Sequence, residues 1–176
     1  MFSKTSVRSL LLAPVCILLL ALPAMAALDG FIFVQGARQG PFKGSLKRNG
    51  REASRVIEVK SSIEAPRDPH TGLASGKRQH KPIIIVKEVD AASRQYSEAL
   101  NKHEALSEVV IEFNVRGKSP EKLTLNNAMI TGIRRTPRSS GGGGGKNETE
   151  EITFTYQKIE WTWTGGKKTF NDDWQQ

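Results

Sequence analysis

The sequence predicts a mostly β protein, either a small antiparallel β-barrel or a sandwich of two packed sheets, with one short α-helix. Short segments rich in β-branched and aromatic residues recur along the chain, and Gly, Pro, Asn or Ser bounds each of them. A single segment, residues 90–102, has helical spacing instead. A chain of 176 residues is also long enough for one domain with a core but short for two.

The N-terminal segment has the three parts of a secretory signal. Lys4 and Arg8 precede an apolar stretch at residues 10–22, and the small residues Ala24 and Ala26 follow. We predict cleavage after Ala26, which leaves a single domain at residues 27–176. The apolar stretch is shorter than the roughly 20 residues of a membrane-spanning helix, so no stable membrane insertion is expected after cleavage.

Cysteine and charge narrow the possible functions. The chain has one cysteine, Cys16, and it lies in the predicted signal, so the mature protein has neither a disulfide nor a thiolate nucleophile. Loss of Lys4 and Arg8 with the signal lowers the formal net charge from +8 to +6. Because the basic residues are spread along the chain, we interpret them as a solvated surface and expect no nucleic-acid partner.

The first predicted strands open the mature chain. Residues 31–34, FIFV, form the first one, and residues 55–63 form another. Alternation along the second segment places Ile57, Val59 and Ile63 on one face.

Two further segments have stronger strand patterns. Residues 82–89 are apolar on both faces and are expected to lie in the centre of a sheet. Residues 107–117 alternate cleanly, and the residues predicted to point inward are Val109, Ile111, Phe113 and Val115.

The last predicted pair of strands, residues 122–133 and 150–164, contains a change of parity. Ile152, Phe154 and Tyr156 mark one face of the second segment, whereas Ile159, Trp161 and Trp163 mark the other. A regular strand cannot bury both sets on one face, because its side chains alternate with a period of two. We therefore predict a bulge or bend near Gln157 and Lys158, or a strand that serves two packed surfaces. Residues 139–147, which contain the glycine run, are predicted to be a flexible loop.

The helical segment, residues 90–102, is predicted to be short and amphipathic. Asp90 or Ser93 is expected to be its helix cap, and Tyr96, Ala99 and Leu100 form one apolar stripe.

A search for catalytic, cofactor-binding and metal-binding residues selects none. Residues 72–78, GLASGKR, have three residues between their glycines, and Arg78 occupies the position that the magnesium-binding Ser or Thr of a phosphate loop would need. The histidines at 70, 80 and 103 lack metal-ligand spacing. A hydrolase that uses His80 or the Asp172–Asp173 pair has no support from spacing. We interpret Tyr156, Trp161, Trp163 and Trp174 as packing or interface aromatics.

Most of the chain after the predicted signal resembles the haemolysin-coregulated protein (Hcp) family, the tube-forming component of type VI secretion systems. The segments that carry the resemblance are MAALDGFIF, TGLASGKRQHKPIIIVKEVDAAS, EALNKHEALSEVVIEF, LTLNNAMITGI, EEITFTYQKIEWTWTGG and DDW. Where family members usually have a glycine after the helix, this chain has Lys102 and His103.

The resemblance implies a structural, non-enzymatic protein that forms six-membered rings, which stack into a tube. It implies no cofactor, and it suggests other type VI secretion components and small effectors held in the lumen as partners. It also implies that an extended loop at residues 66–82 reaches a neighbouring subunit or ring. The predicted interface residues in this loop are Thr71, Gly72, Ser75, Gly76, Lys77, Arg78, Gln79, His80, Lys81 and Pro82.

Two alternatives follow from the residues themselves. The signal predicts export to the periplasm or the exterior, but translation from Met25, where the family commonly starts, would leave the protein in the cytoplasm. An exported monomeric β-barrel that binds a polyanion or glycan through its basic loop is the alternative function.

Overall fold

The computed structural model describes residues 29–114, 121–136, 148–163 and 168–173. The predicted signal segment, the glycine-rich loop at 139–147 and Trp174 lie outside these residues. In the part of the chain that is described, no helix is both long enough and apolar enough to cross a membrane.

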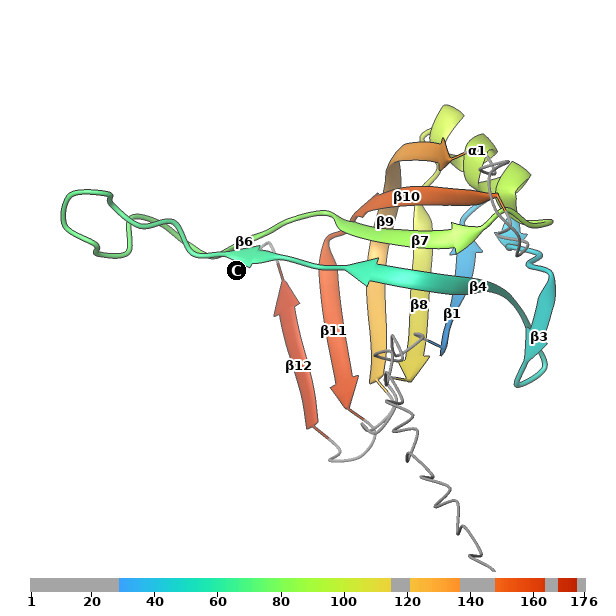
Figure 1. Cartoon of the computed structure of the whole chain (residues 1–176), viewed down its shortest axis with the longest axis horizontal. Helices are drawn as coiled ribbons and strands as arrows, with labels where there is room; N and C mark the ends of the chain where they lie inside the picture. Colours follow the sequence, from blue (N-terminus) through green and yellow to red (C-terminus); the bar gives the residue numbers. More distant parts are fainter. Residues whose placement is uncertain (1–28, 115–120, 137–147, 164–167, 174–176) are drawn as a thin grey trace, which may run out of the picture.

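Antiparallel strands form one curved sheet, and a helix lies at one end of it (Figure 1). In chain order the elements are β1 (Asp29–Gly36), β2 (Gly40–Pro41), β3 (Leu46–Arg48), β4 (Arg51–Lys60), β5 (Ile63–Glu64), β6 (Gln79–His80), β7 (Ile83–Glu88), α1 (Ser93–Asn101), β8 (Leu106–Asn114), β9 (Glu121–Thr136), β10 (Thr149–Thr155), β11 (Lys158–Trp163) and β12 (Lys168–Asp173). The predicted fold class is confirmed.

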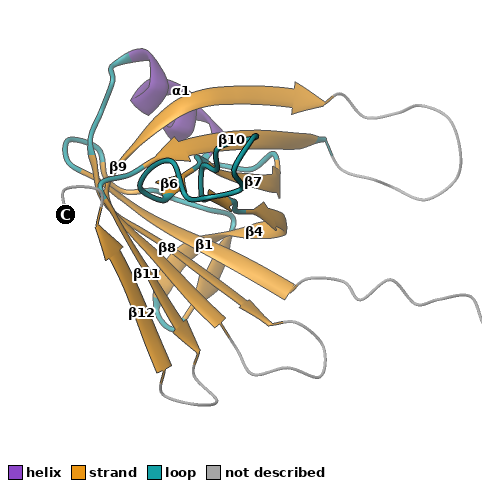
Figure 2. Cartoon of the chain, turned by 90° about the vertical axis from the view of Figure 1, so that its left-hand side faces the viewer, coloured by secondary structure: helices purple, strands orange, loops and turns teal. Residues whose placement is uncertain are grey.

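The long strand β9 closes the sheet into a barrel. Its first part pairs with β8 from Glu121 to Ala128, and its second part pairs with β10 from Met129 to Thr136. Because β10 continues through β7, β4 and β1 back to β8, the ladder returns to its starting strand. Strands β11 and β12 extend from the first part of β9 beyond this closed ring, as Figure 2 shows.

The interior of the barrel is apolar because inward-facing positions alternate along each strand. The predicted inward residues Val109, Ile111 and Phe113 are buried, and so are alternate residues of β7 such as Ile83 and Ile85. Val115, which was also predicted to point inward, lies outside the described residues. Strand β7 is paired on both sides, with β4 and β10, which agrees with its predicted central position.

The prediction that Ile57, Val59 and Ile63 share one face is wrong, because Val59 packs against the core and the other two do not. Ile57 is 42% exposed and Ile63, on β5, is 48% exposed, whereas Val56 is completely buried. The register against β7 shifts between Val56 and Glu58. This bulge adds one residue to β4, so residues after it point to the opposite face from the one that strict alternation would assign. A period of two that is continued across the bulge therefore predicts the wrong face.

The predicted break between the last two strands is confirmed. Strand β10 ends at Thr155, β11 begins at Lys158, and a bend at Gln157 separates them. Both strands pair with β9. Ile152, Phe154 and Tyr156 are buried on one side of the break, and on the other side Ile159 is buried and Trp161 partly buried.

Helix α1 packs its predicted stripe on the barrel, with Tyr96 and Ala99 almost fully buried and Leu100 partly buried. The cap differs from the prediction. Ala92 occupies the N-cap position without a side-chain cap bond. Asp90 lies before the helix, where its carboxylate accepts a hydrogen bond from the Ala92 N–H, and the Ser93 hydroxyl accepts one from the Asp90 N–H. These bonds order the turn that leads into the helix.

Candidate assembly surface

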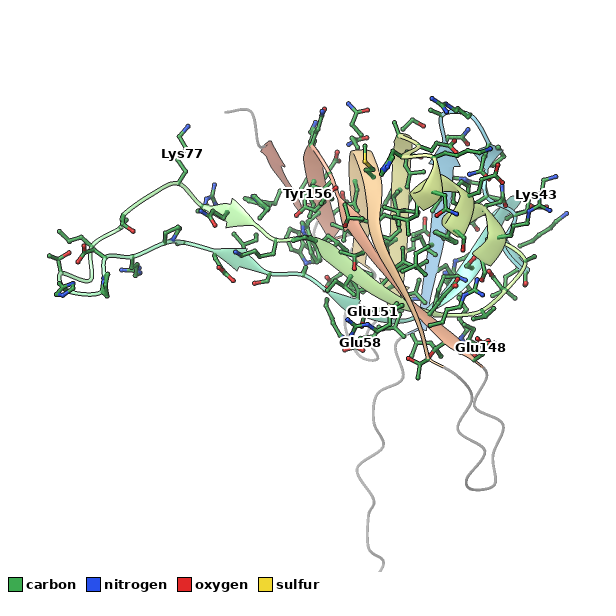
Figure 3. The ribbon with its side chains drawn as sticks, turned by 90° about the horizontal axis from the view of Figure 1, so that it is seen from above. Lys43, Glu58, Lys77, Glu148, Glu151 and Tyr156 are labelled. Atoms are coloured by element: carbon green, nitrogen blue, oxygen red, sulfur yellow. The ribbon has the colours of Figure 1, made fainter. Side chains whose placement is uncertain are left out.

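A long hairpin arm, residues 61–82, leaves the barrel between β4 and β7 and extends well beyond it (Figures 1 and 3). The short strands β5 and β6 pair near its root, and a bridge between Arg67 and Ala74 pairs the two sides again near its tip. The predicted loop at residues 66–82 therefore contains ladder bonds of its own.

The tip of the arm is an ordered turn around Asp68. One carboxylate oxygen of Asp68 accepts hydrogen bonds from the N–H groups of His70 and Thr71 and from the Thr71 hydroxyl. These bonds, led by the one from the Thr71 N–H, lower the pKa of Asp68 from its ordinary value. Gly72 follows with a φ of +69°, a left-handed conformation that strongly favours glycine.

Contacts between the two sides of the arm close its root, and Tyr156 ties the root to the barrel. The Lys81 ammonium lies 3.0 Å from the Glu64 carboxylate, and the Lys81 N–H donates to the Ser62 carbonyl at 3.0 Å. The Tyr156 hydroxyl donates to the Lys81 carbonyl at 3.3 Å, and the His80 ring packs edge-on against the Tyr156 ring. The arm is therefore fixed where it leaves the barrel.

The predicted interface residues occupy the arm with different exposures. His80 is buried at the root and Lys81 is half-buried, so both serve to anchor the arm in this structure. The rest are exposed: Thr71, Gly72, Ser75, Gly76, Lys77, Arg78, Gln79 and Pro82. Sequence reasoning missed Leu73, an apolar side chain at the tip that is 69% exposed.

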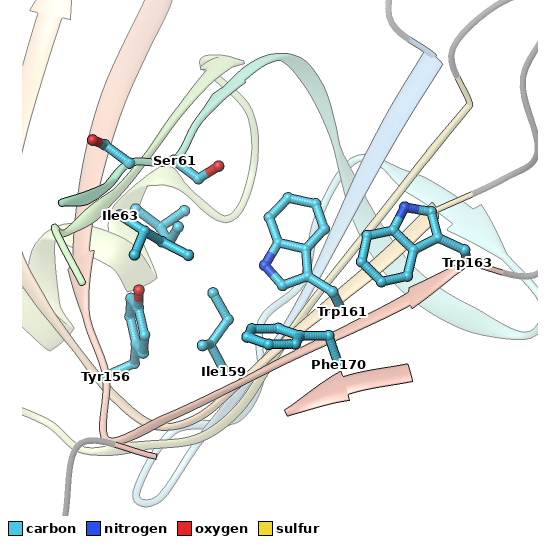
Figure 4. A pocket seen from close by; sticks show the side chains of 9 residues that line it. Ser61, Ile63, Tyr156, Ile159, Trp161, Trp163 and Phe170 are labelled. Atoms are coloured by element: carbon cyan, nitrogen blue, oxygen red, sulfur yellow. The ribbon is translucent and has the colours of Figure 1, made fainter. Parts of the chain in front are cut away.

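An apolar groove of about 240 Å³ lies beside the root of the arm (Figure 4). Strands β11 and β12 form one wall, and the chain between β4 and β5 forms the other. Its lining consists of Ser61, Ser62, Ile63, Ile83, Tyr156, Ile159, Trp161, Trp163 and Phe170.

Three of the predicted aromatic residues therefore meet at one place. The Trp161 and Trp163 rings are stacked with centroids 6.1 Å apart, and Trp161 packs edge-on against Phe113 in the core. Trp163 is 36% exposed, whereas Tyr156 is buried. The stack thus runs from the barrel core to its surface.

In the described part of the chain, the histidines and aspartates considered as candidates do not come together in a catalytic or metal site. His70 lies at the tip of the arm, His80 at its root and His103 after α1. In the four described ranges, no group of three His, Cys, Asp or Glu side chains could hold a metal ion. Asp172 and Asp173 lie at the end of β12, and their side chains are outside the described part.

Comparison with known proteins places this fold among secretion proteins. Residues 31–163 match the sequence profile of the family described as "Type VI secretion system effector, Hcp". The chain is 29% identical over 167 residues to the "Major exported protein" of Pseudomonas aeruginosa, a match that covers 89% of this chain and 97% of the relative.

Solved structures share the same fold. A crystal structure titled Hcp protein matches with a TM-score of 0.73 and 22% identity, over 83% of this chain and 99% of the other. Hcp1 of the E. coli EAEC 042 pathovar, with two tryptophan substitutions, matches with a TM-score of 0.70 and 21% identity, over 84% and 99%. Secreted protein Hcp3 of Pseudomonas aeruginosa matches with a TM-score of 0.65 and 22% identity, over 84% and 99%.

The barrel, the projecting arm and the family match together define a structural component of a type VI secretion system. The chain belongs to the Hcp family, whose profile covers most of the described barrel, and its function is that of a tube protein. The predicted family is confirmed.

Proposed function

We propose that this chain is a non-enzymatic subunit that forms six-membered rings, which stack into the secretion tube, and that its arm makes the contact with a neighbouring copy. The observation that carries this proposal is an arm anchored at its root, ordered at its tip and exposed in between. Eight of the ten interface residues predicted from the sequence are exposed.

Pre-organisation supports the arm as a binding element. A flexible loop loses conformational freedom when it binds, and that loss weakens the complex. Here the Tyr156 and Glu64 contacts hold the root, and the hydrogen bonds to Asp68 hold the turn. The arm can thus bind with little further ordering, which is the property expected of a subunit contact.

The shape of the arm favours a head-to-tail contact. An arm that projects from one side of a subunit and binds a different surface of the next subunit makes a heterologous interface. Such interfaces generate a closed ring when the rotation closes and a filament when it does not. The exposed side chains of Lys77, Arg78 and Gln79 supply hydrogen-bond donors for that contact.

The proposal also covers where the rings are located and which proteins they bind. A relative that matches almost end to end is named a major exported protein, which supports export of this chain. We place its rings in the periplasm or outside the cell after removal of residues 1–26, with other secretion components and small effectors as partners.

The test is the oligomeric state of the purified protein, after its N-terminus has been established by mass spectrometry. We expect multi-angle light scattering to give a six-fold mass at low and moderate salt, and negative-stain microscopy to show closed rings. A monomer at every concentration tried would overturn the proposal.

A monomeric polyanion-binding protein is the second candidate, favoured by the exposed basic residues Lys77 and Arg78 on the arm. It predicts that binding to heparin-like glycans weakens steeply with salt and is lost in a Lys77→Gln, Arg78→Gln double variant. If the protein forms rings and its glycan binding is the same with and without the two substitutions, the polyanion-binding function is excluded.

A further inference from the structure

We propose that the apolar groove beside the arm's root is the receptor for the arm tip of a second copy of this chain, with Leu73 as the inserted side chain. This inference rests on the proposed assembly, and it names the surface that the arm binds. The groove is defined by the residues that line it between β11, β12 and the chain after β4.

The inserted element is Leu73. Its side chain is 69% exposed, more than that of any other large apolar residue among the described ranges. The Asp68 N–H donates to the Leu73 carbonyl at 2.9 Å, so the backbone at this position is held by the turn. An apolar side chain presented in water on an ordered tip gains most from burial against another surface.

The receiving surface has matching chemistry. The groove's lining is almost entirely apolar, and its volume of about 240 Å³ accommodates a branched aliphatic side chain. Ile63 is 48% exposed and Trp163 is 36% exposed, so the groove's rim is itself apolar surface in contact with water. Strands β11 and β12 carry this surface, and both lie outside the closed part of the barrel.

The arm cannot fill the groove of its own chain. The groove lies at the root of the arm and Leu73 lies at its tip, and both views of the molecule show the hairpin running away from the barrel. Occupation of the groove by Leu73 therefore requires a second copy. The contact is head-to-tail, the arrangement that rings and filaments share.

Cross-linking between copies tests the pairing directly. Both variants are made in the full chain with Cys16→Ser, which removes the native cysteine. The first carries Ala74→Cys, beside Leu73. The second carries a size tag and Ser62→Cys, on the groove wall. We expect mild oxidation of the mixture to give a disulfide between the two variants, because docking brings residues 74 and 62 of different copies together. Lys43→Cys, exposed on the side of the barrel away from the arm (Figure 3), replaces Ser62→Cys in the matched control.

A second substitution tests the role of the leucine. Leu73→Asp in the Ala74→Cys variant should weaken association by about tenfold or more and remove the cross-link, whereas Leu73→Met should keep both. Because residue 73 is exposed in the single copy, circular dichroism should show both variants folded.

The outcomes separate this inference from the proposed function. Rings that form without the 74-to-62 cross-link, or with no more of it than the Lys43→Cys control gives, overturn the groove as receptor and leave the ring proposal standing. Rings that form equally well with Leu73→Asp also overturn the groove as receptor and leave the ring proposal standing. The same conclusion follows if the groove binds an apolar additive or another protein while the rings persist. A protein that stays monomeric overturns both.

Discussion

The Lys87 ammonium lies 2.9 Å from the Glu150 carboxylate, and neither side chain is exposed. Lys87 also contacts Asp90 at 2.8 Å, and the Ser93 hydroxyl donates to Glu150 at 2.7 Å. The ion pair therefore links β7 and β10 to the turn before α1, at the place where the helix joins the barrel.

Breaking this buried pair from one side should destabilise the protein strongly. We expect Lys87→Met to lower the free energy of unfolding by about 3–5 kcal/mol, because it leaves the Glu150 charge buried without its nearest cation. The double variant Lys87→Met, Glu150→Leu should recover most of the loss. Urea unfolding of the three proteins measures this coupling, and equal stability of the single and double variants would contradict it.

Glu104 is expected to make the protein sensitive to acid. Burial raises the pKa of Glu104, but hydrogen bonds from Gln39 and Arg38 outweigh burial and hold the pKa below its ordinary value of 4.5. A lowered pKa in the folded state means that this stabilisation is present above pH 4.5 and is lost as the pH falls through the folded value. We expect Glu104→Gln to cost about 1–3 kcal/mol at pH 7. The cost should shrink in unfolding measurements at pH 3, and a cost that stays constant with pH would contradict this account.

Replacing His103 by glycine should stabilise the folded protein. It follows α1 with a φ of +46°, a left-handed conformation that favours glycine. Since a left-handed conformation costs a non-glycine residue roughly 1 kcal/mol, His103→Gly should raise the free energy of unfolding by up to that amount. The adjacent Lys102 has a φ of −96°, so Lys102→Gly is the matched control and should not stabilise. Thermal melts compare the two, and a lower melting temperature for His103→Gly would refute the prediction.

The turn at the arm tip should matter for assembly more than for folding. Gly72→Ala is strained because the φ of Gly72 is +69°, and it should disturb the tip without touching the barrel core. Gly76→Ala is the control, since a Cβ there meets Pro66 only at ordinary contact distance, 3.8 Å. We expect light scattering to show weaker ring formation for Gly72→Ala alone, with unchanged melting temperatures. Equal assembly of the two variants would mean that the tip conformation does not contribute.

Period-two alternation predicted much of the barrel. It also contained information that the sequence analysis did not use. The change of parity between Tyr156 and Ile159 predicted the break between β10 and β11. The same alternation places Lys87 with Ile85 and Glu150 with Ile152 on the buried faces, so the burial of each residue, though not their pairing, could have been found from the sequence. On β4 the alternation failed, because one extra residue near Ile57 has no signal in composition.

The candidate site was predicted only in part. The arm came from a resemblance to Hcp proteins, and its tip residue Leu73 was overlooked because a single apolar residue among glycines has no periodic partner. The aromatic residues Trp161 and Trp163 were recognised as packing or interface residues, but Ile63 was grouped only with Ile57 and Val59 on one strand face. The groove that joins them was not predicted.

Local spacing and contiguous motifs were enough to predict the class of fold, the position of the helix, the break near Gln157 and the family. The closure of the barrel by β9, the contact between Lys87 and Glu150, and the groove that both Ile63 and Trp163 line became apparent only in the folded chain. These contacts join residues far apart in the chain, and their geometry depends on register, twist and bulges summed over several strands.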